Sequence, residues 1–387
     1  MRIAFVTNIC PHYRVQTFET LARYHDVDYY FFSAGDEWYW QRQHGVQSGN
    51  FKHVYLPGVR IGNTRITPTL LPQLLHGNYD LYVKCINGRF ALPVTYLAAR
   101  LRRKPFVLWT GIWQRLDTPA HRLFFPLTRY FYRHADAVAV YGEHVKRYLI
   151  GEGVSAEKIF IATHALDNQS YRRSLPADER RQLLADLNIE PHQRIVLSLG
   201  RLEPSKGLDV LLKAFALANR PESVLLIVGT GSLRAELERQ AAELGLSERV
   251  RFAGYVANEQ AWRYYALAWM LAVPSVTMPA FKEPWGLVVN EAFNQGVPVI
   301  ASDAVGAAVG GLVRDGETGL VVPERDAAAL ALALGTLLDQ PELRDRMGRN
   351  AAQLIAGWDN EAMVAGFRAA LDYAVCTNAA ISKGLSR

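Results

Sequence analysis

Segment 282–296 combines two glutamates, a glycine and a helix start in an apolar setting, reading Lys-Glu-Pro-Trp-Gly-Leu-Val-Val-Asn-Glu-Ala-Phe-Asn-Gln-Gly. Gly286 lets the backbone come close to a ligand. The unpaired N–H groups at a helix start, together with the helix dipole, then favour negative charge near Gly286, Leu287 and Val288. We predict that this segment binds an anionic group at the start of its helix.

Glu283 and Glu291 lie on either side of that anion position. Glu283 precedes the helix, where it is placed at the hydroxyls of a sugar. Glu291 lies about two helical turns further along and can accept hydrogen bonds from both hydroxyls of a ribose. The alternative is a pair of solvated charges on an amphipathic helix. The apolar neighbours imply a mostly buried segment, which favours the ligand role.

Two cations flank a strand-to-helix turn in segment 200–207, which reads Gly-Arg-Leu-Glu-Pro-Ser-Lys-Gly. The strand pattern Ile195–Leu199 precedes the turn, and a helix opens at Leu208. Ligands of parallel α/β sheets bind at the carboxyl ends of the strands, so Arg201 and Lys206 beside a helix start suit a diphosphate. The alternative is a turn with two solvated basic residues.

A glycine-rich turn, Val-Gly-Thr-Gly-Ser at 228–232, also joins a strand to a helix, and we expect Ser232 to cap that helix. Gly229 and Gly231 would allow a ligand to approach the backbone, but close packing of strand and helix explains them equally well. The third glycine of the dinucleotide-binding pattern is missing. Its absence argues against a simple NAD-dependent enzyme.

These turns need parallel strands to position them. Short apolar runs alternate with amphipathic segments in both halves of the chain, a pattern that indicates parallel α/β sheets. We predict two doubly wound units, residues 1–165 and 166–358, with the polar stretch 163–179 as the linker. The expected strands are Ile3–Thr7, Val27–Phe32, Leu81–Cys85, Phe106–Trp109 and Ala137–Tyr141, then Ile195–Leu199, Val224–Val228, Val250–Ala253, Met270–Val273 and Val297–Ala301.

The second half of the chain resembles a known family. Gly-Arg-Leu-x-Pro-x-Lys-Gly, Val-Gly-x-Gly-x-Leu, Phe-x-Gly-Tyr-Val and Glu-Pro-Trp-Gly-Leu-x-x-x-Glu-Ala are similar in type, order and spacing to the GT4 family of retaining GT-B glycosyltransferases. The segments 296–303 and 315–320 continue the resemblance. It covers residues 195–322 with high specificity, while the remainder is similar in architecture only.

The resemblance implies a role for each candidate residue. Arg201 and Lys206 would hold the donor diphosphate and neutralise the departing nucleotide, with no cofactor and no bound metal. Glu283 would hold the donor sugar, and backbone groups around Tyr255 and Val256 would lie beside the base. The catalytic set is then Glu283, Arg201, Lys206 and His12. The nucleotide-binding set is Arg201, Lys206, Gly229, Gly231, Tyr255, Val256, Trp285, Gly286, Leu287, Val288 and Glu291.

The fold that the resemblance implies is GT-B, an α/β architecture of two Rossmann-like domains facing each other across a cleft. The N-terminal domain would bind the acceptor, and the C-terminal domain the nucleotide sugar, with a UDP-sugar as the expected donor. In this family the closing helix crosses back to the first domain. We therefore assign the helical pattern within residues 359–387 to the N-terminal domain.

One departure from the family concerns a histidine. Members often place one after a strand of the N-terminal domain, near the donor sugar, but here Thr110 and Gly111 occupy that place. His12 follows the first strand and could approach the site from the carboxyl edge of that sheet, although a lone histidine in a turn is more often structural. Arg14 could face a phosphate on the same grounds.

Charge is distributed unevenly along the 387 residues. Residues 1–165 hold 20 lysines and arginines against 11 aspartates and glutamates, so the basicity lies in the N-terminal half. Such a half can attract an anionic membrane, a phosphorylated acceptor or nucleic acid, or be an ordinary solvated surface. Segment 121–133 mixes arginines and aromatics as a membrane-surface helix would, but we prefer a helix that packs on the sheet.

Composition excludes other classes of protein. No stretch approaches the ~20 apolar residues of a membrane span, and the N-terminus lacks a signal-peptide layout. Cys10, Cys85 and Cys376 are far apart and suggest buried thiols, neither a disulfide framework nor a zinc site. We expect a cytoplasmic protein, with contact at the inner face of the membrane through the basic N-terminal domain, and no nucleic-acid partner.

The expected function is transfer of a hexose-type sugar from a nucleotide diphosphate sugar to a glycan or lipid-linked acceptor, as in the assembly of cell-surface polysaccharide. A GT-B nucleotide-sugar epimerase would bind the same donor but would need an acid/base set in place of an acceptor pocket. A non-catalytic nucleotide-sugar-binding regulator would not require Arg201, Lys206, Glu283 and Glu291 together. The full set therefore favours transfer.

Overall fold

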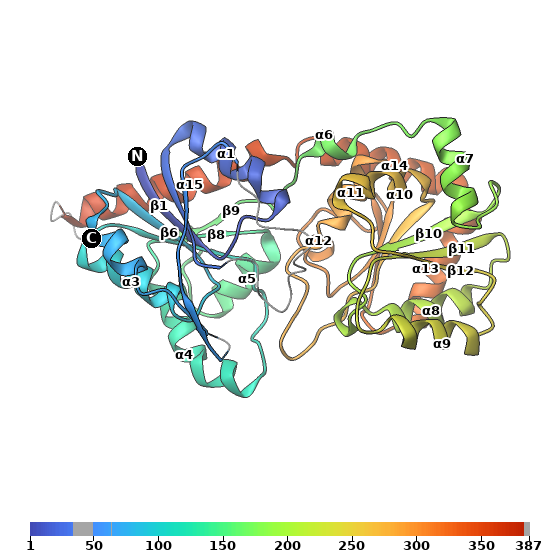
Figure 1. The fold of residues 1–387 in the computed structure, drawn as a ribbon, viewed down its shortest axis with the longest axis horizontal. Helices are drawn as coiled ribbons and strands as arrows, with labels where there is room; N and C mark the ends of the chain where they lie inside the picture. The colour runs from blue at the N-terminus through green and yellow to red at the C-terminus, as the bar shows by residue number, and fades with distance from the viewer. Residues whose placement is uncertain (34–48, 63, 383–387) are drawn as a thin grey trace. The chain divides into compact units, whose positions relative to one another are not determined.

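The computed structural model describes residues 1–33, 49–62 and 64–382, which form two compact units (Figure 1). The first unit comprises Met1–Trp113, Pro119–Leu166 and Asp359–Arg387. The second comprises Gln114–Thr118 and Asp167–Trp358. Each unit has its own parallel sheet and its own core.

The first unit is built on a seven-stranded parallel sheet in the order β3-β2-β1-β6-β7-β8-β9. Helices α1 and α15 cover one face and α2 and α3 the other (Figure 1). The strands are β1 (Arg2–Thr7), β2 (Asp26–Phe31), β3 (His53–Tyr55), β6 (Leu81–Cys85), β7 (Phe106–Thr110), β8 (Ala137–Val140) and β9 (Ile159–Ile161), beside an antiparallel pair β4 (Val59–Ile61) and β5 (Thr64–Ile66). The helices are η1 (His12–Arg14), α1 (Val15–Tyr24), α2 (Leu70–His76), α3 (Ala91–Leu101), α4 (Pro119–His134), α5 (Glu143–Gly151), η3 (Ala156–Lys158) and α15 (Asn360–Ser382).

The second unit repeats this plan with six parallel strands in the order β12-β11-β10-β13-β14-β15. Its strands are β10 (Arg194–Leu199), β11 (Ser223–Val228), β12 (Val250–Gly254), β13 (Met270–Val273), β14 (Val299–Ser302) and β15 (Gly319–Val322). Its helices are α6 (Asn168–Tyr171), α7 (Ala177–Asp186), η4 (Pro204–Lys206), α8 (Leu208–Ala218), α9 (Arg234–Glu243), α10 (Asn258–Leu267), α11 (Val288–Asn294), α12 (Gly306–Val309), α13 (Ala327–Asp339) and α14 (Pro341–Ile355).

The central strands form because their apolar runs are buried on both faces. Every residue of β6, β7, β8 and β11 is buried, as expected for parallel strands covered by helices on both sides. The predicted doubly wound α/β fold is therefore confirmed, and each predicted strand overlaps a strand of the structure. The strands β3, β9 and β15, of three or four residues, escaped sequence analysis because so short a run carries little periodicity.

Two local expectations are corrected. The stretch 163–179, predicted as the linker, contains helix α6 and the start of α7, and the Asp167 side chain caps α6 by accepting a hydrogen bond from the Gln169 N–H at 3.1 Å. Ser232 does not cap the following helix, since α9 begins at Arg234 after an N-cap at Leu233. Of the cysteines, Cys10 and Cys85 are buried whereas Cys376 is exposed.

Helix α15 packs on the first unit through an apolar face, and the buried side chain of Asn360 adds hydrogen bonds at its start. The Asn360 amide donates to the Leu166 carbonyl at 3.0 Å and to Gln16 Oε1 at 2.6 Å. Its Oδ1 accepts from the Thr17 hydroxyl at 2.5 Å. Among the helices that the structure describes, none is both long and apolar enough to cross a membrane.

We predict that Asn360→Ala destabilises the first unit by about 2 to 4 kcal/mol, because it leaves the buried Leu166 carbonyl and Thr17 hydroxyl without their partner. Denaturant unfolding measures the change. The adjacent Glu361→Ala is the control, because its contacts with Tyr24 and Arg23 lie at the surface and should contribute less than about 1 kcal/mol. Equal stability of the two variants would contradict the assignment.

Candidate functional site

The candidate site lies where the strand order of the second sheet reverses. Strand β10 has β11 on one side and β13 on the other, so the loops that follow β10 and β13 leave the sheet in opposite directions. A crevice at such a switch point is the usual ligand site of an open α/β sheet. Segment 200–207 follows β10, and segment 274–287 follows β13.

Backbone hydrogen bonds join the loops along this edge. The Gly200 N–H donates to the Val228 carbonyl at 2.9 Å, and the Gly229 N–H donates to the Gly254 carbonyl at 2.7 Å. The Val276 N–H donates to the Ser205 carbonyl at 2.9 Å. Consecutive loops therefore satisfy one another's polar groups and form one connected surface.

Gly229 and Gly231 are required by the packing between these loops. A Cβ at Gly229, where φ is +135°, would lie 1.8 Å from the Gly200 carbonyl oxygen. A Cβ at Gly231 would lie 2.3 Å from the Leu202 carbonyl oxygen. Of the two sequence interpretations, close packing is enough to account for both glycines.

Both predicted diphosphate-binding cations are paired with carboxylates. Lys206 Nζ donates to Glu283 Oε2, which brings together the loops after β10 and β13. Arg201 Nη1 donates to Glu203 Oε1 at 2.6 Å. The four side chains are 11% to 30% exposed, so their charges are partly withdrawn from water. An incoming anion must compete with Glu203 and Glu283 for these cations.

Glu203 was not singled out by the sequence analysis, although it lies inside the motif 200–207. The family pattern leaves its position variable, so the resemblance assigned it no role. Its importance is visible only from the ion pair with Arg201. A signal was nevertheless available in the sequence, because a glutamate two residues from an arginine in one tight turn can reach it.

Backbone N–H groups at the start of helix α12 hold the loop that carries Glu283. The Gly306 N–H donates to the Glu283 carbonyl at 3.1 Å, and the Ala307 N–H donates to the Trp285 carbonyl at 2.7 Å. Gly286 has φ of +92°, a conformation that favours glycine at the turn into α11. Helix α11 then starts at Val288, with Leu287 at its N-cap, as the anion-site prediction requires.

Trp285 corrects one of the predicted binding residues. Its side chain is 1% exposed, donates from Nε1 to Asn290 Oδ1 at 2.8 Å, and lies 5.9 Å from the Trp358 ring. A ring buried in the core is closed to a nucleotide, so only the backbone of Trp285 remains available. The indole instead anchors the Glu283 loop to helix α11.

Glu291 lies on α11 between two tyrosines. Its Oε1 accepts from the Tyr171 hydroxyl at 3.2 Å and its Oε2 from the Tyr265 hydroxyl at 2.6 Å. Burial raises the pKa of Glu291 above its usual value, and the hydrogen bonds from Tyr265 and Tyr171 offset only part of this rise. Sequence analysis missed both tyrosines, which lie 120 and 26 residues away from Glu291.

Tyr255 and Val256 follow β12 at the same edge of the sheet. Tyr255 is 43% exposed, and Val256 is half-buried. Gly254, immediately before them, has φ of +73° and accepts the hydrogen bond from Gly229. The turn of the chain at Gly254 therefore ties this pair to the loop after β11.

His12 lies in the first unit, in the turn η1 after β1, with its ring centroid 5.3 Å from that of Tyr13. Arg14 ends the same turn and is buried. It donates from Nη2 to the Tyr141 hydroxyl at 2.9 Å and lies 4.3 Å from the centre of the Trp109 ring. Thr110, at the place of the family's histidine, is buried and accepts from the Ile112 N–H at 3.1 Å.

His164 joins the cluster around Arg14 and was not predicted. Its ring stacks on that of Tyr141 with 4.3 Å between centroids. Burial, and then the nearby Arg14 charge, lower the pKa of His164 well below its usual value. The imidazole is therefore neutral around pH 7, and Arg14 is the charged group of this aromatic cluster.

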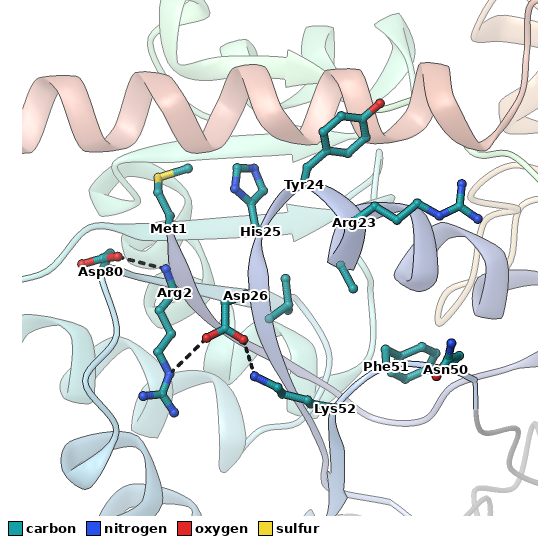
Figure 2. Close-up of a pocket in the computed structure, with 12 residues that line it drawn as sticks. Met1, Arg2, Arg23, Tyr24, His25, Asp26, Asn50, Phe51, Lys52 and Asp80 are labelled. Carbon is teal, nitrogen blue, oxygen red and sulfur yellow. Dashed lines mark hydrogen bonds and ion pairs between the residues drawn. The ribbon is translucent and has the colours of Figure 1, made fainter.

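A hollow in the first unit lies at the amino ends of the strands, away from the edge where ligands bind (Figure 2). Its acidic side chains already have partners, Lys52 for Asp26 and the backbone N–H of Arg2 for Asp80. Lys52 Nζ lies 2.6 Å from Asp26 Oδ1, and the Arg2 N–H donates to Asp80 Oδ2 at 2.9 Å. We do not assign this hollow to the candidate site.

The described residues contain no group of three or more histidines, cysteines, aspartates and glutamates placed to hold a metal ion. Arg201 and Lys206 are the cations predicted to balance an anion in the second unit, and the structure places both in the loop after β10.

Two sequence families match the chain in succession. Residues 17–169 match the family described as Glycosyltransferase Family 4, and residues 179–354 match the family described as Glycosyl transferases group 1. The first match covers much of the first unit, and the second covers most of the second unit.

Individual proteins agree with these matches. The chain is 30% identical to the α-D-kanosaminyltransferase of Streptomyces kanamyceticus over 287 residues, 71% of this chain and 72% of that protein. It is 37% identical to the D-inositol 3-phosphate glycosyltransferase of Streptomyces scabiei over 237 residues, 57% of this chain but 49% of that protein. The chain thus spans about half, or less, of the length of several curated relatives that it matches.

The fold is shared with solved structures. The crystal structure of Anabaena HepE in complex with UDP superposes with a TM-score of 0.76 at 22% identity, covering 96% of this chain and 100% of that one. At this identity the likeness establishes the architecture, which is GT-B with two Rossmann-like domains.

Glu203→Gln should tighten the binding of inorganic pyrophosphate by up to about fivefold, because partly exposed ion pairs such as Arg201–Glu203 contribute ~0.2–1 kcal/mol. Isothermal calorimetry measures the affinity. Glu236→Gln is the matched control, since it makes the same charge change in a surface pair with Arg239 on α9. Equal affinities in the two variants would remove Arg201 from the anion site.

Proposed function

The chain belongs to the GT4 family of glycosyltransferases, and from this premise we propose that it is a retaining hexosyltransferase. It transfers a sugar from a nucleotide diphosphate sugar, with UDP-sugar as the proposed donor, to a glycan or lipid-linked acceptor. The second unit binds the donor and the first binds the acceptor. Uridine is in keeping with the UDP in the HepE crystal.

The contact between Lys206 and Glu283 carries this proposal. It puts a cation and a carboxylate from two different loops at the switch point of the second sheet. In the proposed complex Lys206 turns to the diphosphate, and Glu283 then accepts hydrogen bonds from the sugar hydroxyls. Arg201 supports the diphosphate beside Lys206, and Glu291 holds the ribose.

Catalysis on this scheme is electrostatic. The bond between the anomeric carbon and the diphosphate breaks as negative charge develops on the leaving oxygen, and Lys206 and Arg201 stabilise that charge. The acceptor hydroxyl attacks from the face that the diphosphate leaves, so the anomeric configuration is retained. The leaving phosphate is the nearest base for the acceptor proton. We keep His12 as the candidate catalytic side chain of the first unit.

The proposal specifies the acceptor only by its chemical class. One relative is described as a D-inositol 3-phosphate glycosyltransferase and another as an α-D-kanosaminyltransferase, so the relatives do not point to one acceptor. Loops of the first unit would set the choice of acceptor, because loops vary more readily than the sheets that carry them. A lipid-linked acceptor would also bring the enzyme to a membrane surface.

Helix α4 supports contact with a membrane. Although Phe125, Phe131 and Tyr132 face the core, Leu123 is 74% exposed and Leu127 is 46% exposed. Phe124 and Tyr130 are exposed as well, so the helix is apolar on two sides, whereas the sequence analysis preferred a single face packed on the sheet. Exposed arginines lie on the same helix as these exposed apolar side chains, and their positive charge would favour contact with an anionic membrane surface.

The donor is identified by a thermal-shift screen of nucleoside diphosphates and their sugars, since a ligand that binds the folded state raises its stability. We expect UDP and a UDP-hexose to give the largest shifts, and turnover with that donor to persist in excess chelator. No shift with any nucleotide would refute the proposed activity. Interconversion of the donor sugar without transfer would identify an epimerase.

Lys206→Ala should lower kcat for release of the nucleoside diphosphate by about 10²–10³, with a smaller loss of donor affinity, because charge develops on the leaving group in the transition state. Lys213→Ala, on the exposed side of α8, is the control. Near-normal kcat at saturating donor, with much weaker binding, would make Lys206 a ground-state ligand and contradict the mechanism.

Leu123→Asp combined with Leu127→Asp should release the protein from vesicles rich in anionic lipid without changing its melting temperature, because both side chains are exposed. Sedimentation with anionic and with zwitterionic vesicles measures the binding. If the unaltered protein fails to sediment with anionic vesicles, the membrane proposal is wrong.

A further inference from the structure

The carboxylate of Glu291 is held by tyrosines from two different helices. The Tyr171 hydroxyl at the end of α6 donates to Oε1 at 3.2 Å, and the Tyr265 hydroxyl of α10 donates to Oε2 at 2.6 Å. Each carboxylate oxygen therefore has a donor of its own. A side chain with free rotation about its terminal bonds is confined to one orientation by this arrangement.

The two tyrosines are themselves fixed. Tyr265 is fully buried and Tyr171 is 8% exposed, with 6.4 Å between their ring centroids. A buried phenol hydroxyl needs a hydrogen-bond partner, and here the partner is the carboxylate. The aromatic rings are rigid supports, so the positions of the hydroxyls follow from the packing of α6 and α10 against α11.

Helix α6 is also tied to α11 by amide side chains. Asn294 Nδ2 donates to Asn168 Oδ1 at 2.8 Å, and Arg172 Nε donates to Asn294 Oδ1 at 2.9 Å. These bonds place the short helix α6 independently of the tyrosine. The position of Tyr171 relative to Glu291 is therefore fixed by contacts other than the hydrogen bond between them.

The tyrosines leave part of the carboxylate available. An ionised carboxylate has about four acceptor positions, two on each oxygen. Since each oxygen accepts one bond from a tyrosine, one position on each oxygen is left. Two acceptor positions on one carboxylate match the two neighbouring hydroxyls of a ribose, with one hydroxyl to each oxygen.

We propose that Tyr171 and Tyr265 are positioning residues that orient Glu291 toward the 2′- and 3′-hydroxyls of the donor and so make the site selective for ribonucleotides. The inference rests on the proposed function, because it takes Glu291 as the ribose ligand. The new element is the pair of tyrosines that orient the Glu291 carboxylate. The same hydroxyls favour the ionised carboxylate, which is the better acceptor, against the effect of burial.

A merely structural role for the tyrosines makes a different prediction. If they only support α6 and α10, their loss should weaken every nucleotide alike, whether or not it carries ribose hydroxyls. A positioning role should weaken only those ligands that contact Glu291. A nucleotide that lacks both hydroxyls therefore separates the two interpretations.

The experiment compares the dissociation constants of UDP and 2′,3′-dideoxy-UDP, measured by calorimetry. If the donor screen selects another base, the diphosphate of that base and its dideoxy analogue are used. The variants are Tyr171→Phe, Tyr265→Phe and Glu291→Gln. Tyr264→Phe is the matched control, because it makes the same change on the same helix at a half-buried neighbour of Tyr265.

We expect each of Tyr171→Phe and Tyr265→Phe to weaken UDP binding about three- to tenfold, the loss that corresponds to one hydrogen bond, and to leave the dideoxy analogue unchanged. Tyr264→Phe should behave as the unaltered protein. In a Glu291→Gln background, Tyr265→Phe should cause no further loss of preference for the ribonucleotide.

Two results would overturn the inference while leaving the ribose role of Glu291 intact. One is loss of the ribonucleotide preference in Glu291→Gln but not in either tyrosine variant. The other is equal weakening of both nucleotides in the tyrosine variants. If Glu291→Gln itself keeps the full preference, then Glu291 is not the ribose ligand, and that part of the proposed function fails together with this inference.

Discussion

The contact between Lys206 and Glu283 is the interaction on which the arrangement of the second unit's site depends. It joins the loop after β10 to the loop after β13, which diverge because the strand order reverses between them. A crevice opens at such a point in any doubly wound sheet, but its walls carry chemistry only if polar groups reach across it. Here a lysine and a glutamate do so. Gly229 and Gly231 after β11, and Tyr255 and Val256 after β12, lie on the neighbouring loops of the same sheet edge.

The Lys206–Glu283 pair and the Arg201–Glu203 pair explain how the proposed anion site remains stable without an anion. Partly buried cations are costly when unpaired, and the described structure gives Arg201 and Lys206 a carboxylate each. On the proposed function, binding of a diphosphate would exchange one set of charge pairs for another. The affinity for the diphosphate would accordingly be the difference between the free energy of its contacts with the two cations and that of the ion pairs it replaces. Turnover depends on how much the cations gain when charge develops on the leaving group.

The first unit also buries a cation, but the groups that surround it are different. Arg14 is buried near the carboxyl edge of its sheet, and the groups around it are the Trp109 ring and the Tyr141 hydroxyl. The Trp109 and Tyr13 rings and the Tyr141 hydroxyl stabilise this cation. The two sheet edges thus differ in chemistry. Among the residues that the structure describes, the second edge pairs its cations with carboxylates, whereas Arg14 at the first edge lies among aromatic rings.

The sequence by itself determined most of the strands and the doubly wound α/β fold, and it singled out Arg201, Lys206, Glu283 and Glu291, because these depend on periodicity and on residues close together in the chain. Only the tertiary structure decided which groups meet. Tyr171 and Tyr265 reach Glu291 from other helices, Trp285 turns into the core, and Gly229 packs on the backbone of Gly200. Helix α6 likewise forms in a stretch without apolar periodicity, since its contacts with α11 come from residues more than a hundred positions away. A local pattern records which face of an element is buried, whereas the partner on that face depends on how distant elements pack.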